Sequence, residues 1–209
     1  MTIERPAVPE DLATPQEVEL GGAFRPAPEV EEWLRCQLIL ETGDLHNPEH
    51  AHLEDAVIGC LWTNVPASRK QRAILATAEL PTPGGDPWTI ARRDERFLEW
   101  FGAVPDFLLT FYAPYCAEAT DRQFAALVEH ELYHGAQRLD AYGMPQFDRQ
   151  TGLPRFEVRG HDVEEFVGVV RRYGAANPGV QNLVKAANAD PEVGEASIAQ
   201  ACGACLVRR

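Results

Sequence analysis

The chain has 209 residues, of which 45% are hydrophobic and 24% are charged, a composition typical of a globular protein with one substantial core. Acidic residues outnumber Lys and Arg by 32 to 19, and the resulting net charge of −13 disfavours binding to nucleic acids or to anionic membranes. The sequence has no apolar run of the roughly 20 residues that a membrane span needs, and its N-terminus lacks the features of a secretory signal. Because its five cysteines are scattered and odd in number, we expect a cytoplasmic protein with reduced thiols.

The first part of the chain is predicted to form an arm, a helix and a turn. Residues 1–27 are rich in Pro, Glu and Ala without a sustained apolar period, which predicts a flexible or loosely packed arm. Residues 28–42 carry apolar side chains at helical spacing and predict an amphipathic helix. Residues 46–56 are polar and contain three of the six histidines, and we interpret them as a solvated turn.

Three apolar segments that are bounded by turn signals predict strands. They are residues 56–65, 71–80 and 106–116. The third is almost continuously apolar, so we expect it to be buried on both faces of a sheet. Residues 94–101 predict a short helix between the second and third strands.

The rest of the chain is predicted to be mainly helical. Residues 121–141 predict a long helix with Asp121 as its N-cap, and a linker rich in Gly and Pro separates it from a second helix at residues 161–174. Residues 175–209 predict a weakly structured tail. The order of elements therefore predicts an α+β domain over residues 28–174, with a small, mostly antiparallel or mixed sheet and helices packed on it.

The long helix contains the sequence His130-Glu131-Leu132-Tyr133-His134, an HExxH motif. Two histidines four residues apart project from one face of a helix, so both imidazoles can reach one metal ion at the roughly 2.0–2.1 Å that zinc requires. Glu131 lies about 100° around the helix from His130, beside the metal rather than on it. It can there act as general base toward a metal-activated water. The motif predicts a catalytic zinc site.

The remainder of this helix supports that interpretation. An apolar stripe runs along it, centred about 140° from the histidine face, and consists of Phe124, Val128, Leu132, Gly135 and Leu139. One face can therefore pack on the sheet while the histidines look into a cleft. Tyr133, about 60° from His130, is expected to line that cleft.

A catalytic zinc needs a third protein ligand, and the sequence offers three candidates. Asp140 would complete an HExxHxxGxxD pattern, but Gln137 stands where that pattern has a glycine. Glu164 or Glu165 could supply a carboxylate from the next helix. His161, the only histidine downstream of the motif, begins that helix after a turn-back and is the favoured candidate.

Other side chains near these positions are candidates for a supporting role. Asp162, Glu164 and Glu165 can accept a hydrogen bond from a ligating histidine, although an acidic first turn also suits the helix dipole. Tyr173 is a candidate lining or oxyanion-binding residue. The Cys202-Gly203-Ala204-Cys205 segment is interpreted as part of a frayed tail.

The segment ALVEHELYH, followed by a linker and GHDVEEFVGVVRRYG, resembles the phage metallopeptidase family, a relative of the SprT-like and WLM-type minimal zinc peptidases. The resemblance covers residues 105–174 well and residues 28–104 by the general order of elements. It implies a zincin-like core, a phage or bacterial-host origin and a peptide or protein substrate. SprT-type chains often continue into a four-cysteine zinc ribbon that this chain lacks, so a DNA-directed role is not implied.

The same resemblance implies His130, His134 and His161 as zinc ligands and Glu131 as the general base. We therefore expect a zinc-dependent metallopeptidase. The alternative is a non-catalytic, zinc-stabilised binding or regulatory module of phage origin, in which a protein side chain such as Glu165 closes the fourth coordination position. Neither hypothesis predicts the oligomeric state.

Overall fold

The structure is a computed structural model. It describes residues 4–69, 71–81, 84–163, 167–174, 178–194 and 196. The helical elements, including short 3-10 and π segments, are η1 (Glu10–Leu12), η2 (Val18–Leu20), α1 (Pro28–Leu34), η3 (Arg35–Ile39), η4 (Pro48–Leu53), α2 (Pro87–Phe101), α3 (Ala113–Glu118), α4 (Asp121–His134), α5 (Val167–Tyr173) and α6 (Pro178–Ala187). The strands are β1 (Phe24–Pro26), β2 (Ile58–Thr63), β3 (Ser68–Arg69), β4 (Arg72–Ala73), β5 (Ala76–Glu79), β6 (Phe107–Tyr112), β7 (Gly135–Gln137) and β8 (Phe156–Val158). Among the described helices, none has the length and apolar character needed to cross a membrane.

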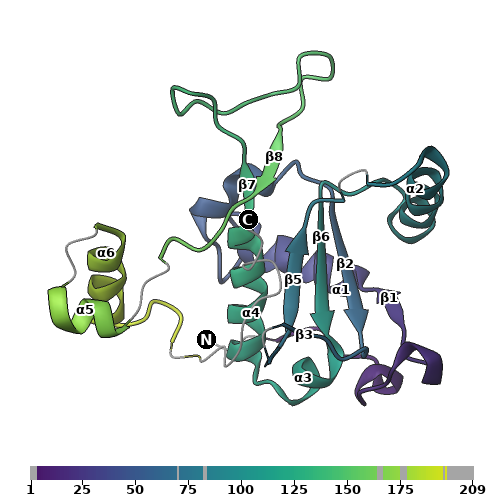
Figure 1. Ribbon diagram of the computed structural model, residues 1–209, viewed down its shortest axis with the longest axis horizontal. Helices are drawn as coiled ribbons and strands as arrows, with labels where there is room; N and C mark the ends of the chain where they lie inside the picture. Colours follow the sequence, from purple (N-terminus) through teal and green to yellow (C-terminus); the bar gives the residue numbers. More distant parts are fainter. Residues whose placement is uncertain are drawn as a thin grey trace.

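The main sheet has four strands in the order β1-β2-β6-β5 (Figure 1). β2 and β6 are parallel, whereas β1 and β5 run antiparallel to their neighbours. This mixed sheet with its helices confirms the predicted α+β class. β2 is buried along its whole length because the sheet is covered on both faces, which is why its sequence is apolar without alternation.

Helices α1 and α4 cover one face of the sheet and α2 covers the other (Figure 1). On the first face Phe124 of α4 packs against Trp33 of α1 and Trp62 of β2, with ring centroids 5.3 and 6.1 Å apart. On the second face Leu61 and Phe97 form a smaller cluster. The large aromatic contacts fix α4, and therefore its HExxH segment, against the sheet.

Helix α2 is longer than the predicted helix at residues 94–101. It begins after Asp86, whose carboxylate accepts hydrogen bonds from the backbone N–H groups of Trp88 and Thr89. Pro87 occupies the first helical position, and Gly102 ends the helix with a φ of +72°. The Asp-Pro pair was the sequence signal for this N-terminus.

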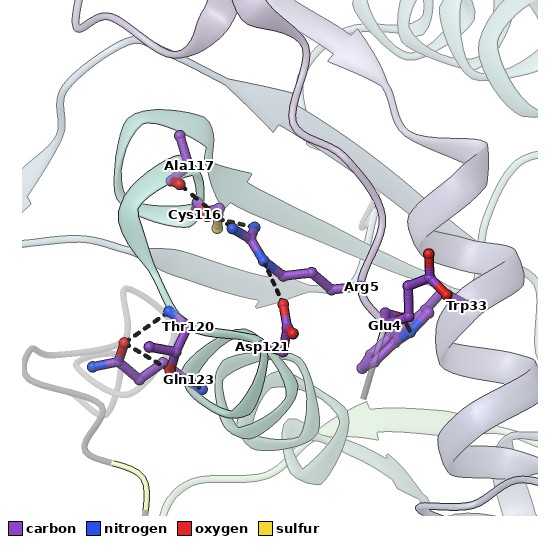
Figure 2. A network of polar contacts seen from close by, with 8 residues as sticks. All are labelled: Glu4, Arg5, Trp33, Cys116, Ala117, Thr120, Asp121 and Gln123. Atoms are coloured by element: carbon purple, nitrogen blue, oxygen red, sulfur yellow. Dashed lines mark hydrogen bonds and ion pairs between the residues drawn. The ribbon is translucent and has the colours of Figure 1, made fainter. Parts of the chain in front are cut away.

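Helix α4 begins at Asp121 as predicted, but its N-cap is Thr120. The Thr120 hydroxyl accepts a hydrogen bond from the backbone N–H of Gln123, whose side-chain oxygen accepts one from the backbone N–H of Thr120 (Figure 2). Asp121 is instead paired with Arg5 at 3.2 Å. Both residues are suitable N-caps, and only the three-dimensional arrangement decides between them.

The segment before residue 28 packs more closely than its composition predicts. Arg5 donates hydrogen bonds to the carbonyl oxygen of Cys116 at 2.6 Å and to Asp121, and Trp33 donates one to the carbonyl oxygen of Glu4 at 2.7 Å (Figure 2). Leu12 is buried in the main core. Specific contacts thus hold the described part of this segment at the N-terminal end of α4. The domain boundaries at residues 28 and 174 stay predictions.

The C-terminal third differs most from the prediction. Helix α4 ends at His134 rather than at residue 141, because the chain becomes extended at Gly135 and enters the β7–β8 hairpin. Leu139, which was predicted to belong to the apolar stripe of this helix, therefore lies beyond the end of the helix and is 52% exposed. The predicted helix at residues 161–174 is described as helical only from Val167, and the tail expected to be weakly structured contains α6.

Candidate metal centre

Three histidines converge at the C-terminal end of α4. His130 and His134 occupy its last turn, and His161 follows strand β8 by three residues. The Nε2 atoms of His130 and His161 are 3.2 Å apart, and each of the three rings lies 5.0–5.2 Å from the other two, centroid to centroid. One nitrogen from each ring lies within 4.8 Å of the others. Within the described residues this is the one cluster with metal-ligand geometry.

The spacing of the His130 and His161 nitrogens fits a tetrahedral metal ion. Two nitrogens that each bind zinc at 2.0–2.1 Å lie about 3.3–3.4 Å apart at the tetrahedral angle. The observed 3.2 Å between His130 and His161 is close to that value. Three neutral imidazoles are also a donor set that suits zinc, copper, nickel or iron rather than magnesium or calcium.

His134 is oriented by the end of strand β8. Its Nδ1 atom lies 2.7 Å from the carbonyl oxygen of Arg159, and the Arg159 N–H donates to the carbonyl oxygen of His134 at 3.0 Å. A carbonyl oxygen only accepts hydrogen bonds, so Nδ1 carries the proton and Nε2 presents its lone pair. This is the arrangement found when the second ring nitrogen of a metal-ligating histidine is hydrogen-bonded to the protein.

The surroundings favour neutral imidazoles. Burial lowers the pKa of His130 to about 4, and the nearby His134 and His161 rings add to this shift. Burial also lowers the pKa of His134, against the opposing effect of the hydrogen bond to Arg159. Because only a neutral imidazole can donate a lone pair, both rings are available to a cation at neutral pH.

The structure brings His161 to the motif by a different route from the predicted one. His161 does not begin a helix; it lies in the irregular segment that follows β8. Asp140 lies at the base of the hairpin loop, where its carboxylate accepts hydrogen bonds from the backbone N–H groups of Tyr142 and Met144. The two carboxylate candidates, Glu164 and Glu165, lie outside the described residues.

The remaining predicted site residues surround the centre to different degrees. Tyr133 and Asp162 line a cavity of about 190 Å³ over the three histidines, together with Arg159 and Gly160. The Asp162 carboxylate is largely exposed and lies 3.7 Å from the Arg159 guanidinium. Glu131 is completely buried and does not line this cavity. Tyr173 ends α5, and its side chain is outside the described part of the structure.

The sequence pattern did not predict the polar network that holds the Tyr133 hydroxyl. The side-chain amide of Asn47 donates to the Tyr133 hydroxyl at 2.9 Å and to Glu129 at 2.8 Å. Burial raises the pKa of Tyr133 to about 12, with a further contribution from Glu49. The tyrosine is therefore a neutral, positioned hydroxyl beside the histidines. The Asn47-Pro48 pair, an N-cap followed by proline, was the available sequence signal for η4.

The interpretation of residues 46–56 as a solvated turn is therefore wrong. Pro48–Leu53 forms the 3-10 helix η4, which packs beside β7. His50 is only 1% exposed, and the Nε2 atom of His52 lies 2.8 Å from the carbonyl oxygen of Gly135. The contact of His52 thus joins η4 to the chain that leaves the candidate metal centre.

The fold and the site together define a mixed α/β protein whose HExxH helix presents a histidine cluster suited to a metal ion. A family model described as "Putative phage metallopeptidase" matches residues 31–188, and the chain belongs to this family. Membership implies a metal cofactor and a peptide or protein substrate. No curated protein and no solved structure matches the chain. The relation to SprT-like and WLM-type peptidases stays a prediction.

Proposed function

We propose that this protein is a zinc-dependent metallopeptidase with His130, His134 and His161 as the metal ligands. The observation that carries the proposal is the convergence of three imidazole nitrogens within 4.8 Å of one another, with those of His130 and His161 at a spacing that suits a tetrahedral ion. Three protein ligands leave one position open, as in catalytic rather than structural zinc sites. The proposal includes a cytoplasmic location and a peptidase domain over residues 28–174.

Each residue has a distinct role in the proposed reaction. When bound, zinc supplies Lewis acidity toward the scissile carbonyl and lowers the pKa of water. Glu131 accepts a proton from the attacking water and passes it to the leaving amine. Tyr133, held by Asn47, faces the cavity over the histidines and offers a hydroxyl to the substrate. The hydrogen bond from His134 to Arg159 keeps the ligating nitrogen aimed at the cavity.

A peptide substrate in extended form can add to a free strand edge. Strand β6 is hydrogen-bonded to β2 on one side and to β5 on the other, so it has no free edge for a substrate. Strand β5 lies at the end of the sheet order and contacts α4 (Figure 1). We therefore assign the substrate-binding edge to β5.

One observation favours the alternative of a zinc-stabilised, non-catalytic module. Glu131 is completely buried and lies outside the cavity walls, whereas a general base must reach a water molecule. In the alternative, a side chain such as Glu165 fills the fourth coordination position. The two candidates predict the same metal content but different activity.

The test compares the unmodified protein with its Glu131→Gln variant. Both are purified without added zinc, their metal content is measured by mass spectrometry, and hydrolysis of a mixed peptide library is followed. We expect about one zinc ion per chain in both and hydrolysis only in the unmodified protein. Glu95→Gln, on the exposed side of α2, is the matched control. Hydrolysis that persists in Glu131→Gln would rule out the general-base role, and a zinc-loaded protein without any activity would favour the alternative.

A further inference from the structure

A second cavity opens beside the metal centre, and we call it the side pocket. It has a volume of about 560 Å³ and is lined by parts of η4, β7 and β8. Tyr133, Arg159 and Asp162 line both this pocket and the smaller cavity over the three histidines. Because the two share these walls, a chain bound at the metal centre can place a neighbouring side chain in the side pocket.

The register of the β7–β8 hairpin turns one carboxylate toward the side pocket. Glu157 is paired with Ala136, and both residues line the pocket. Its neighbour Phe156 packs on Phe107 of the core, with ring centroids 5.1 Å apart. Successive side chains of a strand point to opposite faces, so Glu157 faces away from the core.

The side pocket has a negative lining. Glu49, Glu157 and Asp162 contribute carboxylates, against the single guanidinium of Arg159. That guanidinium is already engaged, because Arg159 donates to the carbonyl oxygen of Tyr133 at 2.8 Å and lies 3.7 Å from Asp162. Neither Glu49 nor Glu157 has an ion-pair partner within the residues that the structure describes. Both carboxylates are exposed, and that of Glu49 also interacts with the Tyr133 hydroxyl at the edge of the pocket.

A buried polar group lies in the same wall. His50 lines the side pocket with 1% of its surface exposed, and its Nε2 atom has no hydrogen-bond partner in the described part of the chain. The nearest carboxylate oxygen, on Glu129, is 3.8 Å away, beyond hydrogen-bond distance. A buried polar atom without a partner is costly, so a ligand that reaches it with a polar group is favoured.

We propose that the side pocket binds the lysine or arginine side chain of a peptide substrate next to the bond at the metal centre, with Glu49 and Glu157 as its charged partners. This inference rests on the proposed peptidase function. An acidic side chain would meet two like charges, and an apolar one would desolvate them without compensation. The net charge of −13 would also attract basic peptides over longer distances at low ionic strength.

The test uses labelled pentapeptides that differ only in their central residue, which is Lys, Arg, Gln or Glu. Binding to the zinc-loaded full chain is measured by fluorescence anisotropy, and mass spectrometry reports whether each peptide is cleaved. We expect the affinity for the Lys and Arg peptides to be at least about fivefold higher than for the Gln peptide. If the peptides are cleaved, we expect the same preference in kcat/KM. Added salt should reduce this preference.

Substitutions in the side pocket test whether the preference for Lys and Arg peptides arises there. Glu49→Gln and Glu157→Gln should each reduce this preference about twofold to fivefold, and the double variant should abolish it. The exposed Glu95→Gln serves as the control and should leave it unchanged. Ala136→Phe fills the pocket and should lower the affinity for the Lys and Arg peptides to that for the Gln peptide.

The outcomes separate this inference from the proposed function. Cleavage with equal preference for all four peptides, or a preference that survives in the double variant, would overturn the side-pocket inference and leave the peptidase standing. Selective binding of Lys and Arg peptides without any cleavage would support the pocket and count against the peptidase.

Discussion

The imidazole of His134 donates from Nδ1 to the carbonyl oxygen of Arg159 over 2.7 Å, joining the last turn of α4 to the chain that leaves β8. The Arg159 N–H donates back to the His134 carbonyl oxygen at 3.0 Å. This reciprocal pair orients one proposed ligand and delivers another, because His161 follows only two residues later. The β7–β8 hairpin is thus part of the candidate metal centre.

Breaking this pair should weaken metal binding. Arg159→Pro removes the N–H that bonds to His134, and we expect the zinc affinity to fall about 10- to 100-fold, the usual effect of losing support around a ligand. Arg159→Ala keeps both backbone bonds and is the matched control, with a much smaller expected loss. Competition with a chromophoric chelator measures both. Equal affinities in the two variants would show that the backbone pair does not support the site.

Removing the proposed third ligand should have a larger effect. His161→Ala leaves two nitrogens, so we expect zinc to be lost during dialysis against a weak chelator. Asp140→Ala is the control, because Asp140 only caps the hairpin loop and should leave the metal content unchanged. Metal analysis of dialysed protein checks both. Full zinc occupancy in His161→Ala would point to another third ligand.

The contacts of Arg5 should stabilise the N-terminal end of α4. The Arg5 side chain is only 17% exposed, and its guanidinium donates to the Cys116 carbonyl oxygen and pairs with Asp121 (Figure 2). We expect Arg5→Ala to lower the free energy of unfolding by about 1–2 kcal/mol, since charge-assisted bonds to a partly buried group are lost. Arg25→Ala breaks the exposed pair with Asp11 and should cost less than about 1 kcal/mol. Urea denaturation of the two variants measures the difference, and equal midpoints would contradict this prediction.

Asp148 should make the hairpin loop sensitive to strong acid. Backbone N–H groups of Gln150 and Thr151, aided by Arg155, lower the pKa of Asp148 to about 2. The folded state therefore favours the charged carboxylate. Its contribution to the loop is complete above the ordinary pKa of about 4 and is lost as the pH falls through about 2. An NMR titration of the Asp148 carboxyl carbon measures this pKa, which should rise in Arg155→Ala. A value near 4 in the unmodified protein would refute the loop geometry.

Local sequence patterns predicted the elements that carry their own signal. The apolar runs at β2 and β6 indicated strands, which the structure confirms, and the predicted burial of β6 on both faces is confirmed for most of its residues. The helical spacing around residue 30 and in α4 is likewise confirmed. Such patterns are readable because each residue's burial depends on a period of 2 or 3.6 along the chain itself.

The HExxH spacing by itself determined that two histidines share one helix face. The place of His161 as the only histidine downstream of the motif favoured it among the three candidates for the third ligand. Only the tertiary structure decided where α4 ends and how the third ring reaches the first two. The two short strands β7 and β8 have no period of their own, and they pair residues that lie 19 to 23 positions apart in the sequence. The acidic side pocket likewise combines η4 with β8. Hydrogen bonds and charges between residues so far apart in the chain produce no local sequence pattern. The sequence therefore indicated the candidate metal ligands, but not how the fold brings them together.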